Sequence, residues 1–152
     1  MTIAVSFVTV ADSISKLSIS GVNVKDLNEI PTDASKVLPV LYPIPNGFVT
    51  DVKATRVTMG GGGTAKIDFE YTLNYRYLHS IAGADLGLFS TYTGLMTKLE
   101  LICEKILASD NLTGAIDVTL QNISNVGPLT DPAGKTTYHG VDIALRVLEF
   151  AQ

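Results

Sequence analysis

The sequence predicts a single α+β domain, in which a long amphipathic helix packs on one face of an antiparallel β-sheet. From Lys66 to Tyr77 polar and apolar residues alternate strictly, which is typical of a strand with one buried and one solvated face. Between Leu88 and Ile106 apolar residues recur at spacings of four and three, which predicts the helix. Alternating runs at 116–121 and 141–147 predict two more strands. Because strands and helices do not alternate regularly, a doubly wound nucleotide-binding fold is not expected.

The composition is that of a globular chain. Its 152 residues are enough for one domain with its own core, and 46% of them are hydrophobic while 17% are charged. A formal net charge of −4 offers no basic surface for neutralising phosphates, so sequence-specific nucleic-acid binding is not expected. Cys103 is the only cysteine, which excludes an internal disulfide and a zinc site built from thiolates.

The first residues suit neither an export signal nor a membrane span. The run from Met1 to Leu17 lacks an early Lys or Arg, and the polar residues Thr9, Asp12 and Ser13 interrupt it. We therefore expect a protein that is made in the cytoplasm and has no membrane partner.

The N-terminal third predicts a helix and then an extended arm. From Ile3 to Leu17 apolar residues recur at spacings of four and three, which predicts a helix over about 3–19. Prolines at positions 31, 39, 43 and 45 then exclude a long helix or a central strand. We expect residues of about 22–48 to run extended over the surface, with a short edge strand around 37–42.

The remaining residues, about 49–152, are expected to form the sheet-and-helix core of the single domain 1–152. The run from Val49 to Met59 predicts a strand that pairs with the alternating strand beyond Gly60–Gly63, so that the two form a long hairpin. At about 3.3 Å per residue, an arm of a dozen residues is about 40 Å long, compared with a domain radius of about 15 Å. Part of the hairpin should therefore project.

The run of glycines before Lys66 has to be compared with a phosphate-binding loop. A Walker loop places its lysine directly after the last glycine and a Ser or Thr after the lysine, whereas Lys66 lies three residues after the last glycine and Ile67 follows it. Such a loop also opens a helix, but a strand follows here. We interpret Gly60–Gly63 as a hairpin tip that can adopt positive φ. The alternative, a small nucleotide-binding enzyme that uses this loop with Lys66, Asp68 and Glu70, stays open.

The sequence shows no other catalytic, cofactor-binding or metal-binding constellation. His79 and His139 form no i, i+4 pair and have no neighbouring cysteine; either could form a base with Asp85 or Asp142, but structural roles near strand ends are favoured. The two carboxylates at i and i+2 of the alternating strand could bind a cation or act as an acid and base pair. A solvated face with alternating charge explains them more simply. The tyrosines of the apolar face should pack, with their hydroxyls at the rim.

The element order and three segments resemble the neck proteins of tailed bacteriophages, in particular the tail terminator (tail completion) family of long-tailed phages. The segments are "DLNEIPTDASKVLPVLYPIPNGF" from Asp26, "FEYTLNYRYLH" from Phe69 and "YHGVDIALRVLEF" from Tyr138. The resemblance covers most of the chain from about Asp26 onward and rests on pattern and element order, without a catalytic signature.

The resemblance implies a structural virion protein without enzymatic activity or cofactor. Members of this family form a hexameric ring that caps the tail tube and joins it to the head, so the implied partners are further copies of this chain, the tail tube protein and the head–tail connector proteins. DNA passes through the ring, whose lumen is commonly acidic, and 15 Asp and Glu against 11 Lys and Arg are compatible with this role. A head–tail stopper and a tail tube subunit are alternatives within the same class.

Two regions are candidates for contacts with ring neighbours or with the tail tube. The first is the hairpin tip, namely Met59, Gly60, Gly61, Gly62, Gly63 and Thr64. The second lies in the extended arm, at Leu41, Tyr42 and Pro43. Both hypotheses rest on geometry, because a projecting hairpin and an exposed strand edge can pair with another chain.

Overall fold

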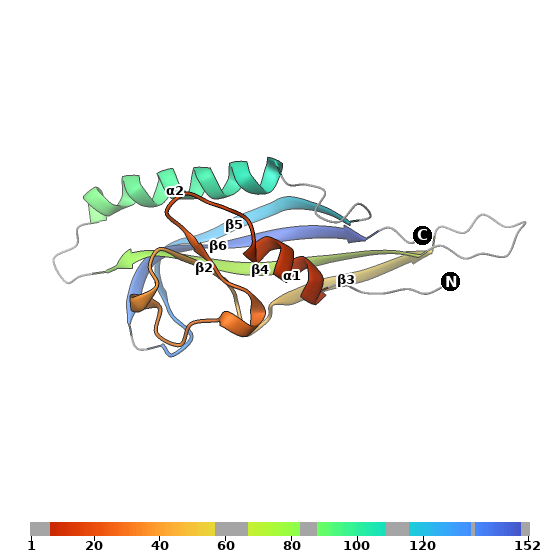
Figure 1. The fold of residues 1–152 in the computed structure, drawn as a ribbon, viewed down its shortest axis with the longest axis horizontal. Coiled ribbons are helices and arrows are strands. Elements are labelled where there is room, and N and C mark those ends of the chain that lie inside the picture. Colours follow the sequence, from red (N-terminus) through yellow and green to blue (C-terminus); the bar gives the residue numbers. More distant parts are fainter. Residues whose placement is uncertain (1–6, 57–66, 83–87, 109–115, 135, 150–152) are drawn as a thin grey trace, which may run out of the picture.

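The computed structural model describes residues 7–56, 67–82, 88–108, 116–134 and 136–149 and has a mixed α+β fold. Within these residues a mostly antiparallel sheet of six strands packs with two α-helices, so the predicted fold class is confirmed at this level (Figure 1). The elements in chain order are α1 (Phe7–Ser15), β1 (Asn23–Val24), two 3₁₀ helices (Leu27–Glu29 and Ala34–Lys36), β2 (Val40–Pro43), β3 (Val49–Arg56), β4 (Ile67–Ile81), α2 (Leu88–Ala108), β5 (Ile116–Thr130) and β6 (Thr137–Glu149).

Strand β4 is the centre of the sheet. The order is β1-β2-β4-β6-β5, and β3 pairs with the same side of β4 as β2 does. Strand β2 pairs with the second half of β4, where Val40 lies opposite Leu78. Strand β3 pairs with the first half, where Val49 lies opposite Leu73. On its other side β4 pairs with β6 along most of its length. All pairs are antiparallel except β1–β2.

The alternation in β4 divides its side chains between the two faces of the sheet, because successive residues of a strand point to opposite sides. The odd-numbered residues from Tyr71 to Tyr77 join the main core. The helices and neighbouring strands supply the rest of it: Val10, Ile14, Ile19, Leu41, Leu95, Leu99, Ile102, Ile106, Val118, Val141, Ile143, Leu145 and Val147. Tyr71, Tyr75 and Tyr77 are at most 1% exposed. The prediction that their hydroxyls reach the rim is therefore wrong, because the helices cover this face.

Helix α2 runs along one face of the sheet (Figure 1). Its residues Leu95, Leu99, Ile102 and Ile106 are buried, and their spacings of four and three place them on one side of the helix. Asp85, one of the two carboxylates that could form a base with a histidine, lies outside the described residues. The buried side chains of α2 therefore join the same core as the tyrosines of β4, and among the strands the helix lies nearest to β5.

Helix α1 ends at Ser15, four residues before the predicted end near 19. The Ser15 hydroxyl donates to the Asp12 carbonyl at 2.6 Å, and serine side chains that bond to the backbone in this way favour helix ends. The chain then turns through Gly21, whose φ of 72° suits glycine. Ile19 stays buried beyond the helix, so the apolar pattern extends further than the helical backbone.

The arm folds back onto the sheet and forms a second, smaller core. Its buried members are Ala34, Val40, Tyr42, Leu78 and Tyr138, and Ile30, Val37, Leu38 and Leu129 pack against them. Strand β2 lies between β1 and β4, so the prediction of an edge strand around 37–42 is wrong. The strand tolerates its prolines because Pro39 precedes it and Pro43 ends it, which places the missing N–H groups at its limits.

Candidate functional site

The two predicted contact regions have different places in the structure. Met59, Gly60–Gly63 and Thr64 lie outside the described residues. Leu41, Tyr42 and Pro43 form most of β2 and are buried within the chain, with Leu41 2% and Tyr42 1% exposed. Burial raises the pKa of Tyr42 to about 12, so its hydroxyl stays protonated. These three side chains face the inside of their own subunit and leave little surface for a neighbour.

Strand β3 offers more surface. The four consecutive residues Asp51–Ala54 are all exposed, and Val52 is 51% exposed. Lys53 and Ala54 are neighbours in the regular part of the strand and point to opposite faces, so their exposure means that no described residue covers either face of β3 there. Within the described residues β3 pairs only with β4, so its outer edge carries N–H and C=O groups without a strand partner.

A bulge and a side-chain clamp set the course of β3. The register with β4 shifts between Thr50 and Lys53, and Asp51 adopts a positive φ of 55°. Before the bulge, the side-chain amide of Asn74 donates to the Gly47 carbonyl at 3.0 Å and to the Thr50 hydroxyl at 3.0 Å. Asn74 thus fixes the start of β3 on the centre of the sheet, while Lys53 and Ala54 just beyond the bulge are exposed on both faces.

The described part of the chain does not bring together the side chains of the alternative enzyme site. Lys66 lies outside them. Glu70 accepts a hydrogen bond from Arg146 Nε at 2.6 Å, and this bond lowers the pKa of the Glu70 carboxyl. A general acid needs a raised pKa, so the pairing opposes that role for Glu70. The paired carboxylate fits the predicted solvated face with alternating charge.

The same face of the sheet carries a more buried ion pair. Arg76 Nε and Nη2 bind the two oxygens of Asp142 at 2.6 and 3.0 Å, and the side chains are 22% and 14% exposed. Arg76 Nη1 also donates to the Thr130 carbonyl at 3.2 Å, and Asn125 Nδ2 donates to Asp142 at 2.8 Å. Asp142 is therefore bound by Arg76 and Asn125 and does not form the base with a histidine that the sequence left open.

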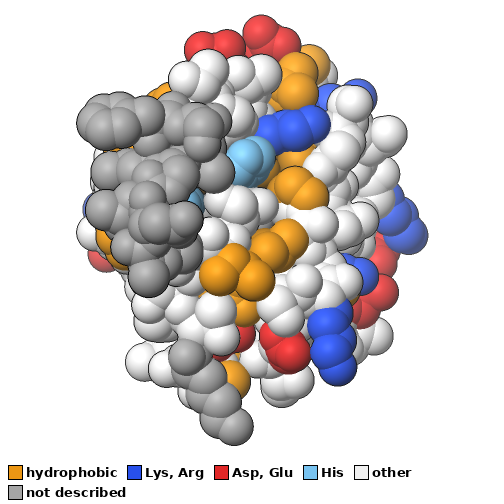
Figure 2. All heavy atoms as spheres, turned by 90° about the vertical axis from the view of Figure 1, so that its left-hand side faces the viewer, with side chains coloured by type: hydrophobic (Ala, Val, Ile, Leu, Met, Phe, Trp, Pro, Cys, Tyr) orange, Lys and Arg blue, Asp and Glu red, His pale blue; other side chains and the backbone are white. Residues whose placement is uncertain are grey.

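The histidines lie near strand ends, and His79 lies against Gly94 of α2. At this end of the molecule a histidine lies beside a basic side chain on the surface (Figure 2). His79 Nδ1 is 2.8 Å from the Tyr77 hydroxyl. His139 is 2% exposed, and its Nδ1 has no hydrogen-bond partner among the described residues. The sequence predicted structural roles near strand ends for both residues, and their positions agree with this. It did not predict that β4 and β6 bring them to the same end of the sheet.

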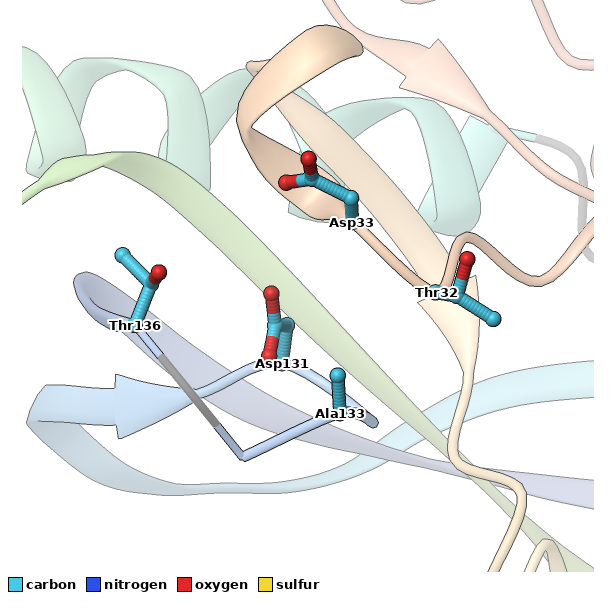
Figure 3. Close-up of a pocket in the computed structure, with 5 residues that line it drawn as sticks. All are labelled: Thr32, Asp33, Asp131, Ala133 and Thr136. Atoms are coloured by element: carbon cyan, nitrogen blue, oxygen red, sulfur yellow. The ribbon is translucent and has the colours of Figure 1, made fainter.

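A polar pocket of about 270 Å³ lies between the arm and the turn that joins β5 to β6 (Figure 3). It is lined by Thr32, Asp33, Asp131, Ala133 and Thr136. Asp131 accepts from the Tyr138 hydroxyl at 3.1 Å and from the Gly134 N–H at 3.0 Å, and Asp33 accepts from the Ser35 hydroxyl at 2.6 Å. The sequence could not reveal this pocket, because its walls come from segments that only the folded arm brings together.

Among the described residues, no group of three or more His, Cys, Asp or Glu side chains could hold a metal ion. In the same part of the chain, neither helix is both long and apolar enough to cross a membrane.

Comparison with known proteins finds a distant similarity. No protein-family model matches the chain. A segment of 113 residues, which is 73% of this chain, is 28% identical to Hexokinase-1 of Arabidopsis thaliana. The match spans 22% of the plant protein, so this chain is similar to about a fifth of that protein's length.

Proposed function

We propose that this chain is a structural subunit of the neck of a long-tailed bacteriophage. As a tail terminator it forms a ring with further copies of itself, caps the tail tube and joins it to the head connector, and DNA passes through the ring. The segments that carry the resemblance to this family contribute β2, β4 and β6, which are neighbours in the sheet. The resemblance therefore falls on one continuous part of the fold, which supports the proposal.

The observation that carries the proposal is the uncovered strand β3. Strand β3 lies at the edge of the sheet beside β4, and Asp51–Ala54 are exposed. In this proposal the edge of β3 pairs with a neighbouring copy in the ring. An isolated protein would more commonly shield such an edge.

The oligomeric state in solution tests the ring. We expect light scattering to give about six copies per particle for the unmodified chain, since closed rings require one repeated contact between copies. The double substitution Val52→Lys and Ala54→Lys places two charges on exposed positions of β3 and should yield monomers. Leu107→Lys is the matched control, because Leu107 is 59% exposed on α2, and it should leave the ring intact.

Two results would contradict the proposal. A chain that stays monomeric at all concentrations, and does so also with purified tail tubes, is not a ring-forming terminator. A ring that persists with both lysines in β3 does not use this edge. Electron microscopy of particles that contain the labelled chain then separates the terminator from a head–tail stopper, which sits on the head side, and from a tube subunit, which repeats along the tail.

The similarity to Hexokinase-1 favours a second candidate, a small nucleotide-binding enzyme that uses Gly60–Gly63 with Lys66, Asp68 and Glu70. Calorimetric titration with a magnesium–nucleotide complex tests it. Saturable binding that Lys66→Met abolishes would support this candidate. Binding that does not respond to this substitution, or no binding, would count against it.

A further inference from the structure

A short loop joins β2 to β3 along one side of β4. The Ile44 N–H donates to the Asn74 carbonyl at 3.0 Å, and the Asn74 N–H donates to the Phe48 carbonyl at 2.8 Å. The main chain is therefore bound to one residue of β4 both before and after residues 45–47. These three residues are all exposed. Because β2 and β3 pair with β4 one after the other, the loop leaves the sheet and returns to it within this short span.

The loop contains Asn46 followed by Gly47, which is the only Asn-Gly pair in the sequence. Gly47 has a φ of 83°, and a Cβ added to it would meet no atom within 4 Å apart from its neighbours in the chain. No described residue forms a hydrogen bond with the Asn46 side chain or with the Gly47 N–H. Since glycine has no side chain beside its nitrogen, this nitrogen and the side-chain carbonyl carbon of Asn46 are both accessible.

We propose that Asn46 is a site of spontaneous covalent modification by deamidation. A base takes the Gly47 N–H proton, and the nitrogen attacks the side-chain carbonyl carbon of Asn46. A new C–N bond closes a succinimide ring, and the side-chain amide takes up a proton from water and leaves as ammonia. Water, the only co-reactant, then opens the ring. Cleavage between the nitrogen and the former side-chain carbon gives aspartate, whereas cleavage between the nitrogen and the main-chain carbon gives isoaspartate.

The isoaspartate product changes the backbone of the loop. Its main chain runs through the former side chain, so the path from residue 46 to Gly47 is longer by one carbon, and the former main-chain carboxyl carries a negative charge. Aspartate carries the same charge on the original backbone. Because the ammonia is lost to the solvent, both changes accumulate with the age of the protein. This inference does not depend on the proposed neck role.

The added length has to be absorbed between the two bonds to Asn74. The ring of Pro45 fixes its φ, which leaves the loop little freedom to adjust. The Gly47 carbonyl, which accepts from Asn74 Nδ2 at 3.0 Å, belongs to the residue next to the lengthened link. The Phe48 carbonyl, which accepts from the Asn74 N–H, follows directly. Isoaspartate at position 46 therefore loosens the start of β3 from the central strand, whereas aspartate leaves it in place.

Peptide mass mapping of the folded chain, aged at pH 6.0 and at pH 8.0, tests the modification. Asn28 and Asn122 are internal controls, because both are exposed and are followed by Glu29 and Ile123. We expect Asn46 to be lost about tenfold faster than either control, since only its neighbour is a glycine. The loss should be faster at pH 8.0, because the attack requires a deprotonated nitrogen. Equal rates at the three asparagines, or an Asn46 that stays intact, would overturn the proposal.

The effect on β3 is tested by hydrogen exchange of the Asn74 amide. Labelling with an isoaspartyl methyltransferase identifies the isoaspartate fraction of the aged chain. In this fraction we expect the Asn74 amide to exchange about tenfold faster, the scale of one lost hydrogen bond. Aged Asn46→Gln, whose longer side chain cyclises more slowly, and freshly prepared Asn46→Asp should both exchange as the fresh chain does.

Two outcomes would exclude the loosening of β3. If the isoaspartate fraction exchanges at the rate of the fresh chain, the loop absorbs the added carbon without loss of the bonds to Asn74. If fresh Asn46→Asp exchanges as fast as the isoaspartate fraction, the negative charge and not the lengthened backbone causes the change. Mass mapping of the native sequence requires no variant, so the modification itself stays testable whether or not a variant folds.

Discussion

The two faces of β4 are stabilised in different ways. On the face under the helices, Tyr71, Leu73, Tyr75 and Tyr77 are buried among apolar side chains. On the opposite face three of the intervening positions form specific pairs with β5 and β6, namely Glu70 with Arg146, Thr72 with Gln121 and Arg76 with Asp142, and only Leu78 at the far end joins the smaller apolar core. Apolar burial stabilises without direction, whereas each polar pair requires one partner at one position.

This difference assigns separate roles to the two faces. A shift of the register by one residue would turn the tyrosines to the polar side and the charged residues into the core. Arg76 lies directly opposite Asp142 in the ladder, so their ion pair also fixes the register. We infer that the helix-covered face supplies most of the folding free energy and that the polar face selects the alignment of the strands.

The largest expected effect is in the core beneath the helices. Leu73 is fully buried, so Leu73→Ala should lower the free energy of unfolding by about 2–5 kcal/mol. Leu148, half-buried on β6 on the opposite face, is the matched control, and Leu148→Ala should lower it by less than half as much. Chemical denaturation measures both. Equal losses would show that the two faces contribute similarly to stability.

The next largest effect is expected from the ion pair of the polar face. Arg76→Met leaves the Asp142 carboxylate largely buried with Asn125 as its remaining partner, and should destabilise the fold by about 2–3 kcal/mol. In the double variant with Asp142→Leu the unpaired charge is gone, so much of the loss should be recovered. A double-mutant cycle measures this coupling. If the losses in the free energy of unfolding from Arg76→Met and Asp142→Leu add up in the double variant, the two side chains are not energetically coupled.

A smaller effect is expected at Thr72, which is 5% exposed. Its hydroxyl donates to the side-chain oxygen of Gln121 at 2.7 Å. Thr72→Val keeps the shape of the side chain and removes this bond, so thermal unfolding should reveal a loss of about 1 kcal/mol. Because Gln121 is exposed, water can replace its lost partner. If Thr72→Val lowered the free energy of unfolding as much as Leu73→Ala, the polar face of β4 would contribute as much to stability as the apolar face, contrary to this prediction.

The smallest effect is expected from the exposed pair of Glu70 and Arg146. The Arg146 guanidinium lowers the pKa of Glu70, so the pair contributes at a pH above the usual carboxyl pKa and is lost as the pH falls through the lowered value. Arg146→Met should raise the pKa of Glu70 towards its usual range, which an NMR titration of the Glu70 carboxyl measures. Added salt should reduce the difference between the two proteins. An unchanged pKa would exclude the contact in solution.

The sequence predicts individual elements well where one periodicity persists. The strict alternation of β4 and the apolar spacing in α2 each reflect one covered face, which a pattern of residues records directly. The sequence does not predict which strands are neighbours: β2 and β3 share one side of β4, and the prolines of the arm indicated an edge strand. That arrangement depends on the second core around Tyr42 and Tyr138, whose members are far apart in the chain.

The candidate surfaces for contact with other chains were harder to predict, because their exposure also depends on residues that are far apart in the chain. Leu41, Tyr42 and Pro43 stand in a proline-rich segment that has the composition of a surface arm, yet contacts with Leu78 and Tyr138 bury the segment. The open part of β3 has no distinctive composition, since Asp51, Val52, Lys53 and Ala54 would suit many strands. They are exposed because no element in the described part of the chain covers them, and tertiary structure decides this.

The clamp of Asn74 on the start of β3 has a mechanical consequence. A force applied along the free strand would load its ladder with β4 in shear, so that the hydrogen bonds share the tension. A force applied across the strand would peel the bonds one after another from the far end, and this needs much less tension. In both cases Asn74 adds an anchor at the start of β3, where the carbonyls of Gly47 and Phe48 and the hydroxyl of Thr50 are tied to the central strand. A neighbour attached to β3 would thus pull on β4, the central strand of the sheet.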